Sequence, residues 1–170
     1  MSLLFIILRL IHIFSGVFWA GTAFFFVSVL EPTIEASGPE GGKVMQRLAQ
    51  SRFPIVLPIA ALLTVLSGLV MYWLDSGGLQ AGWITSGTGL GFTIGAVAGL
   101  AAFVIGVFIS RPAVARLGLL AQQVQASGGP PTPAQGAEIQ ALQKRTSQSA
   151  LWTAILLALA LIGMSIARYL

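Results

Sequence analysis

Residues 53–74 read FPIVLPIAALLTVLSGLVMYWL, an apolar run that contains no charged residue. A helix needs about 20 mostly apolar residues to cross the hydrocarbon core of a bilayer. Three further stretches meet this requirement, at about 3–30, 89–110 and 149–167. Residues 1–170 are therefore expected to form one all-α integral membrane domain, a four-transmembrane-helix bundle.

The composition supports this class of protein. Of the 170 residues, 56% are hydrophobic and 8% are charged, and the mean hydropathy is +0.89. These values are too apolar for a soluble domain of this size, so the lipid bilayer is the expected partner. The basic residues lie beside apolar segments rather than in a separate basic domain, which argues against nucleic acid. The chain has no cysteine, which excludes disulfides and thiolate metal sites.

The basic residues predict how the bundle is oriented. Seven of them lie in the first and third connections, 31–52 and 111–148, while the second connection and the carboxyl tail hold only Arg168. Because basic loops stay in the cytoplasm, both connections are expected there, which gives an N-out/C-out topology. The seven residues are Lys43, Arg47, Arg52, Arg111, Arg116, Lys144 and Arg145.

The third connection is expected to be helical rather than a loose loop. Its apolar residues recur at helical spacing on both sides of a Gly-Pro break at 127–133. Helices three and four should therefore continue into the cytoplasm as an antiparallel hairpin, with a kink at Pro112. At the other cytoplasmic connection, Glu31-Pro32 is expected to end helix one.

Each apolar segment separates small or polar residues from large apolar ones at 100° per residue. In the third segment Gly91, Gly95 and Gly99 recur at four-residue intervals, opposite Leu100 and Phe103. Small residues let membrane helices approach closely. The glycine stripe is therefore predicted to be a helix-packing face, and Leu100 and Phe103 are predicted to face lipid.

Two charged residues are expected at the outer end of the bundle. Arg9 lies inside the first apolar segment, and Asp75 ends the polar stripe of the second. Arg9 either extends its guanidinium to the membrane surface or forms a structural ion pair with Asp75.

His12 is the single histidine, and it lies on the small-residue face one turn deeper than Arg9. An intramembrane histidine either hydrogen-bonds to a neighbouring helix or serves a functional site. Met71 and Met164 are predicted at the same depth on inward faces. Imidazole with thioethers suits copper(I), and a His/Met pair is also an axial ligand set for haem iron. His12, Met71 and Met164 are therefore candidate ligands, although methionines also fill gaps in packed cores.

Three stretches carry a resemblance to a known family: LIHIFSGVFWAG at 10–21, LSGL at 66–69 and ARYL at 167–170. With its four-helix layout, the chain resembles the small bacterial membrane proteins grouped with the copper-resistance D (CopD-like) family. More loosely it is similar to HemJ-type protoporphyrinogen oxidases, in which the corresponding first-helix histidine is associated with haem. That resemblance implies His12 as a ligand. Those oxidases also use a second-helix lysine, which this chain lacks, and the difference argues against oxidase activity.

Two functions are expected from these observations. The first is a non-catalytic accessory subunit of the bacterial plasma membrane, which packs against itself or against other membrane-protein subunits. The alternative is a membrane protein that binds haem b or copper through His12 near the outer face.

Overall fold

The computed structural model describes residues 3–170, except the side chain of residue 39. The described chain is helical throughout apart from short turns. In chain order its elements are α1 (Leu3–Phe25), η1 (Phe26–Leu30), α2 (Glu31–Ala36), α3 (Pro39–Gln50), α4 (Phe53–Asp75), α5 (Ala81–Ile84), α6 (Gly87–Ile105), η2 (Gly106–Ser110), α7 (Arg111–Ser127), α8 (Pro133–Ile166) and η3 (Ala167–Tyr169).

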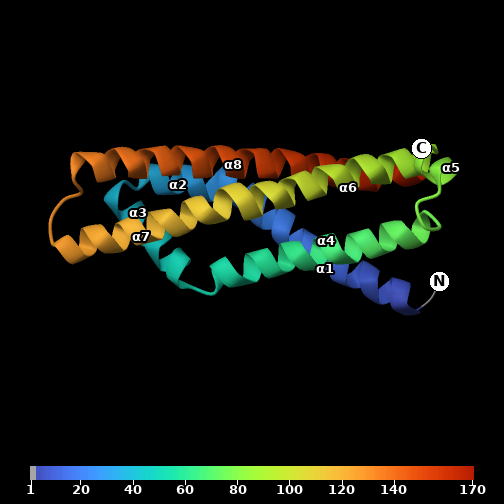
Figure 1. The fold of residues 1–170 in the computed structure, drawn as a ribbon, viewed down its shortest axis with the longest axis horizontal. Helices are drawn as coiled ribbons and strands as arrows, with labels where there is room; N and C mark the ends of the chain where they lie inside the picture. Colours follow the sequence, from blue (N-terminus) through green and yellow to red (C-terminus); the bar gives the residue numbers. More distant parts are fainter. Residues whose placement is uncertain (1–2) are drawn as a thin grey trace.

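The prediction of an all-α fold with four long apolar helices is confirmed. Within residues 3–170, four helices are long and apolar enough to cross a membrane: Leu3–Ala36, Phe53–Asp75, Gly87–Ser127 and Pro133–Tyr169. They lie roughly alongside one another in an elongated bundle (Figure 1). Both chain termini lie at one end, here called the terminal end, and the turn between α7 and α8 lies at the other, here called the hairpin end.

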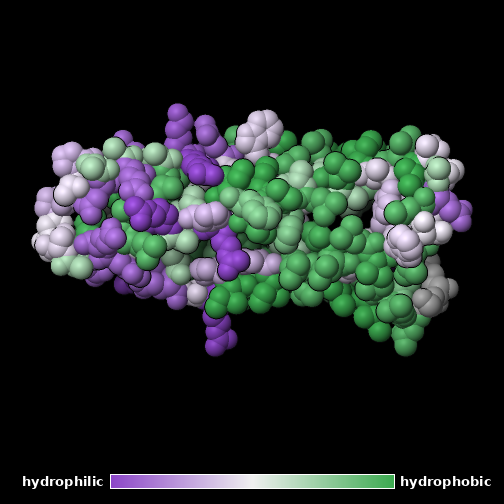
Figure 2. Space-filling model, in the orientation of Figure 1, coloured by the Kyte–Doolittle hydropathy of each residue, from purple (hydrophilic) through white to green (hydrophobic). Residues whose placement is uncertain are grey.

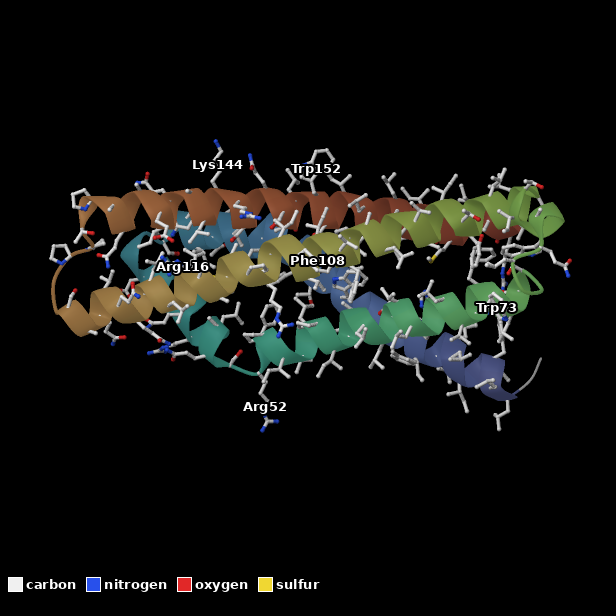
Figure 3. All side chains as sticks on the ribbon, viewed as in Figure 1. Arg52, Trp73, Phe108, Arg116, Lys144 and Trp152 are labelled. Atoms are coloured by element: carbon white, nitrogen blue, oxygen red, sulfur yellow. The ribbon has the colours of Figure 1, made fainter. Side chains whose placement is uncertain are left out.

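The surface of the bundle is apolar over most of its length. Figure 2 shows hydrophobic residues from the terminal end past the middle, and hydrophilic residues concentrated at the hairpin end. Large side chains such as Phe14 (73% exposed), Phe108 (68%) and Trp152 (58%) project from this apolar surface, and Figure 3 shows Phe108 and Trp152 on it. Exposed apolar surface of this extent is typical of a surface that contacts a membrane or another protein.

Two of the long helices continue through prolines that were expected to end or kink them. A π-helical segment precedes each proline: η1 lies before Glu31-Pro32, and η2 lies before Arg111-Pro112. Proline has no amide hydrogen to donate, so it interrupts the regular hydrogen bonds of an α-helix. A π turn shifts these hydrogen bonds by one residue, and the helix can then continue past the proline. The prediction that helix one ends at Glu31-Pro32 is therefore wrong, because the helix continues to Ala36.

The helices extend beyond their apolar segments as an α7–α8 hairpin. Gly128 adopts a left-handed conformation (φ 65°) at the end of α7, and Thr132 forms a capping box with Gln135 at the start of α8. Glycine adopts this conformation without steric cost, and the capping box satisfies free amides. Arg116 pairs with Glu138 across the hairpin at 2.7 Å. Leu120, only 1% exposed, fills its interior.

The bundle consists of two closely packed helix pairs, α1 with α4 and α6 with α8. In the second pair the backbones approach so closely that no side chain fits at two glycines. A Cβ atom on Gly91 would lie 2.8 Å from Ala167 Cβ, and one on Gly95 would lie 2.8 Å from Met164 Cγ and 3.1 Å from the Ala160 carbonyl oxygen. Both glycines thus lie at the α6–α8 contact.

The glycine stripe does not act as one face, however. A Cβ atom on Gly99 would meet nothing within 4 Å, and this residue lines the space between the two helix pairs. The prediction that Gly99 packs against another helix, as Gly91 and Gly95 do, is therefore wrong. The α8 helix still contacts η2 and α7 further along the chain, so Gly99 is open because it lies on the cavity side of α6.

Gly95→Ala is expected to lower the free energy of unfolding by about 1–3 kcal/mol, the usual cost of an added methyl group in a packed interior. The matched control is Gly118→Ala, because a Cβ atom there meets nothing within 4 Å. Thermal unfolding of both variants in detergent, followed by circular dichroism, measures the difference. Equal stability of the two variants would contradict the role of Gly95 in packing.

The prediction that Leu100 and Phe103 of the third segment face lipid is wrong. Leu100 lines the space between the helix pairs, and Phe103 packs on the core cluster, where its ring lies edge-on to Trp19 at 6.4 Å. The exposed positions are instead Leu90, Ile94, Val97, Val104 and Phe108. This helix has neighbours on two sides, α8 and α4, so the face opposite the glycines is also partly internal.

Candidate functional site

A cavity of about 440 Å³ separates the two helix pairs in the terminal half of the bundle. It borders the core cluster, defined here as Trp19, Ala20, Ala61, Ala102 and Leu157, to which all four long helices contribute, and Trp19, Ala20 and Leu157 of this cluster line it. Large side chains pack closely there and close the space. The cavity walls are mainly apolar as a whole, and all three candidate ligands, His12, Met71 and Met164, line the cavity.

His12 is oriented by a hydrogen bond to the neighbouring helix. Its Nδ1 lies 2.8 Å from the carbonyl oxygen of Thr64 on α4. A carbonyl oxygen only accepts, so Nδ1 carries the hydrogen and donates it. In the neutral ring Nε2 then has no hydrogen, and it makes no hydrogen bond to any residue in 3–170. This arrangement, with one nitrogen donating to a backbone carbonyl and the other free, is the one that metal-binding histidines adopt.

Hydroxyl groups surround this hydrogen bond. Ser67, which is 4% exposed, places its Oγ 3.4 Å from His12 Nδ1 and donates to the Leu63 carbonyl at 2.5 Å. The Thr64 hydroxyl lies 2.8 Å from Ser15 Oγ on α1. A small polar network therefore joins α1 to α4 beside the ring and resists its rotation.

Gly68 provides the space in which the imidazole lies. A Cβ atom at this position would be 2.8 Å from His12 Cε1 and 3.1 Å from Nδ1, but 3.9 Å from Nε2. The edge of the ring with the hydrogen-bonded nitrogen thus packs on the α4 backbone. Any larger residue at position 68 would have to displace the ring.

Met71 and Met164 reach the cavity from opposite helix pairs. Met71 belongs to α4 and Met164 to α8, and both are partly buried. The side chain of Met164 covers Gly95, so its place in the cavity wall depends on that glycine. In the described part of the chain, no three His, Cys, Asp or Glu residues gather into a metal site. Ligands other than His12 would have to come from these thioethers.

The predicted contact ion pair between Arg9 and Asp75 is not formed. The salt bridges of the described residues are Lys43–Glu40 and Arg116–Glu138. Asp75 instead interacts over a longer distance with both Arg9 and Arg168, and all three residues line the terminal part of the cavity. The structure thus replaces the expected pair with a group of three charges, because η3 at the end of α8 brings Arg168 to the same place.

Sequence reasoning missed an aromatic group beside this cavity. Tyr72 donates to or accepts from Thr93 Oγ1 at 2.6 Å, and its ring lies edge-on to Trp83 at 5.3 Å. Trp83 stacks on Phe92 at 6.3 Å. Trp83 belongs to the short helix α5, and helical periodicity cannot predict how a turn places a single residue. The three rings enclose one side of the cavity.

No known protein family, curated protein or solved structure matches this chain. The fold and the site alone therefore define its class. It is a helical bundle with four helices long and apolar enough to cross a membrane, with a half-open cavity that a single histidine lines.

Proposed function

We propose that this chain is a non-catalytic membrane protein that binds haem b through His12. The observation that carries the proposal is the state of the imidazole ring. Nδ1 donates to the Thr64 carbonyl at 2.8 Å, which leaves Nε2 with a lone pair beside an apolar cavity. A fixed, neutral imidazole of this kind suits an axial ligand of haem iron.

The donors and walls of the cavity suit this ligand. Its lining is predominantly apolar with aromatic rings. Its volume of about 440 Å³ is smaller than a haem b, so part of the porphyrin would extend through the open side of the cavity. Met71 and Met164 carry thioethers that can complete a His/Met axial set. Bound haem would supply one-electron chemistry, and the protein would supply its axial ligand and its apolar surroundings.

A copper(I) site is the second candidate, because His12, Met71 and Met164 all line the same cavity. Copper(I) prefers thioether and imidazole ligands. The two candidate cofactors depend on the methionines to different extents. Replacement of both by leucine would remove two of three copper ligands, whereas haem would keep His12.

The role of an accessory subunit remains a prediction. Exposed apolar side chains cover the long helices, and both lipid and a neighbouring subunit would cover such a surface equally well. Co-purification with other membrane proteins at fixed stoichiometry would support this role. It would be compatible with haem binding, because the residues that line the cavity all belong to this chain.

The orientation proposed for the bundle places the terminal end outside the cytoplasm of a bacterial cell, in the plasma membrane. The seven basic residues of the two connections support it. A reporter fused after Leu170 is expected to behave as extracytoplasmic, and a reporter inserted after Gly129 as cytoplasmic. The reverse pattern would overturn the orientation and move the cavity to the cytoplasmic side.

The experiment that tests the proposed function is a titration of the detergent-purified protein with ferric haem b, together with metal analysis of the protein as isolated. A saturable Soret band with one haem per chain is expected. Bound copper without a Soret band would favour the second candidate. The absence of both would contradict a cofactor role for His12.

A further inference from the structure

Two arginines lie at the terminal mouth of the cavity. Arg9 reaches it from α1 and Arg168 from η3. Neither forms a hydrogen bond or a salt bridge with another residue in the described part of the chain. Asp75, the only carboxylate that lines the cavity, interacts with both at longer range.

The charges at this mouth do not balance. Two guanidinium groups and one carboxylate lie among the lining residues, and the exposed Arg168 carries the excess positive charge. Arg9 is partly buried and lies six residues after the start of α1 at Leu3, about 9 Å along the helix axis. An anion bound between the two guanidinium groups would interact favourably with both of them.

The positions along α1 define what kind of ligand fits. His12 lies one turn deeper than Arg9, and Trp19 of the core cluster lies about 10 Å deeper still. A ligand that spans this distance meets cations first, then an imidazole, then an apolar end. This order matches an apolar molecule that carries carboxylates on one edge.

We propose that Arg9 and Arg168 bind the carboxylates of the cavity's ligand and so set its orientation. This inference rests on the proposed function, in which the ligand is haem b and the carboxylates are its two propionates. The planar guanidinium group matches a carboxylate with two parallel hydrogen bonds. Both arginines then act as positioning residues, because they hold the porphyrin edge at the terminal end while His12 binds the iron.

The test compares ferric haem b with its dimethyl ester, which keeps the iron and the ring but has no carboxylate charge. The unchanged protein is expected to bind the diacid at least about tenfold more tightly, since a hydrogen bond to a charged group is worth this much or more. The Arg9→Gln/Arg168→Gln variant should lose the preference. Its Soret maximum should stay the same, because His12 is intact.

Two further variants control the experiment. Arg52→Gln changes an arginine at the start of α4, far from the cavity, where Figure 3 shows the side chain projecting away from the bundle. It should keep the full preference for the diacid. Arg9→Lys/Arg168→Lys retains the charge and should keep part of the preference.

The outcomes separate this inference from the proposed function. If the unchanged protein binds neither porphyrin, the proposed function fails. If it binds both equally, haem binding stands and the role of the arginines is overturned. A preference that persists in the glutamine variant also overturns it. Should that double variant fail to fold, Arg168→Gln alone, at an exposed position, must lower the preference.

Discussion

His12→Ala is expected to abolish the Soret band of the haem-loaded protein and to lower haem affinity by more than about a hundredfold. Loss of an orienting partner of a ligand typically costs 10–100-fold, and loss of the ligand itself should cost more. The helices should remain folded, since alanine favours helix and no buried polar atom loses an essential partner. The Thr64 carbonyl that accepts from His12 also belongs to the α4 backbone ladder. Titration with haem, followed by absorbance, measures the effect.

Free imidazole provides the matching rescue experiment. In the His12→Ala variant the space of the missing ring remains open between α1 and Gly68. Added imidazole should enter it, bind the haem iron and restore a Soret band at high concentration. Ser15→Ala removes a hydroxyl from the same network without touching the ring and should leave the spectrum unchanged. An identical spectrum in wild-type and His12→Ala protein would end the ligand hypothesis.

Gly68→Ala is expected to lower haem affinity by about 10–100-fold, although position 68 contributes no ligand. The added Cβ atom would lie 2.8 Å from His12 Cε1 and 3.1 Å from Nδ1. The ring must therefore move, and the 2.8 Å hydrogen bond to the Thr64 carbonyl is lengthened or lost. A side-chain substitution at Thr64 cannot break this bond, because the acceptor belongs to the backbone.

The control for this change is Gly21→Ala on α1, where a Cβ atom meets nothing within 4 Å. It should bind haem as the unchanged protein does. Absorbance titrations and thermal unfolding of both variants separate an effect on the ring from a general loss of stability. Gly68→Ala with unchanged affinity would mean that the observed ring position is not the one that binds.

The four long helices could be predicted from the sequence because each apolar run is a local property. A segment such as 53–74 must satisfy its own backbone hydrogen bonds in lipid, and only a helix does so within one segment. The helical hairpin beyond residue 111 was also predictable, since periodic apolar residues flank a Gly-Pro turn. For the same reason His12, Met71 and Met164 could be assigned to inward faces before the structure was known.

The residues at which the helices end were predicted less accurately. Glu31-Pro32 has the composition of a helix terminus, yet η1 carries the helix on to Ala36. A π turn depends on how the flanking helix packs, which composition does not record. Leu100 was misassigned for a related reason. A helical wheel gives one inward direction, whereas α6 has neighbours on two sides.

The sequence by itself determined the class of the protein: four apolar helices, a single histidine within an apolar segment, and small residues on one face of each helix. Only the tertiary structure decided how these features combine. It placed the Thr64 carbonyl at His12 Nδ1, put Arg168 beside Arg9 and Asp75, and left a cavity between two helix pairs. The physical reason is the distance along the chain between the residues that interact. Helix formation in lipid depends on contacts within one segment, whereas the cavity and its charges depend on side chains from different helices that no local pattern relates.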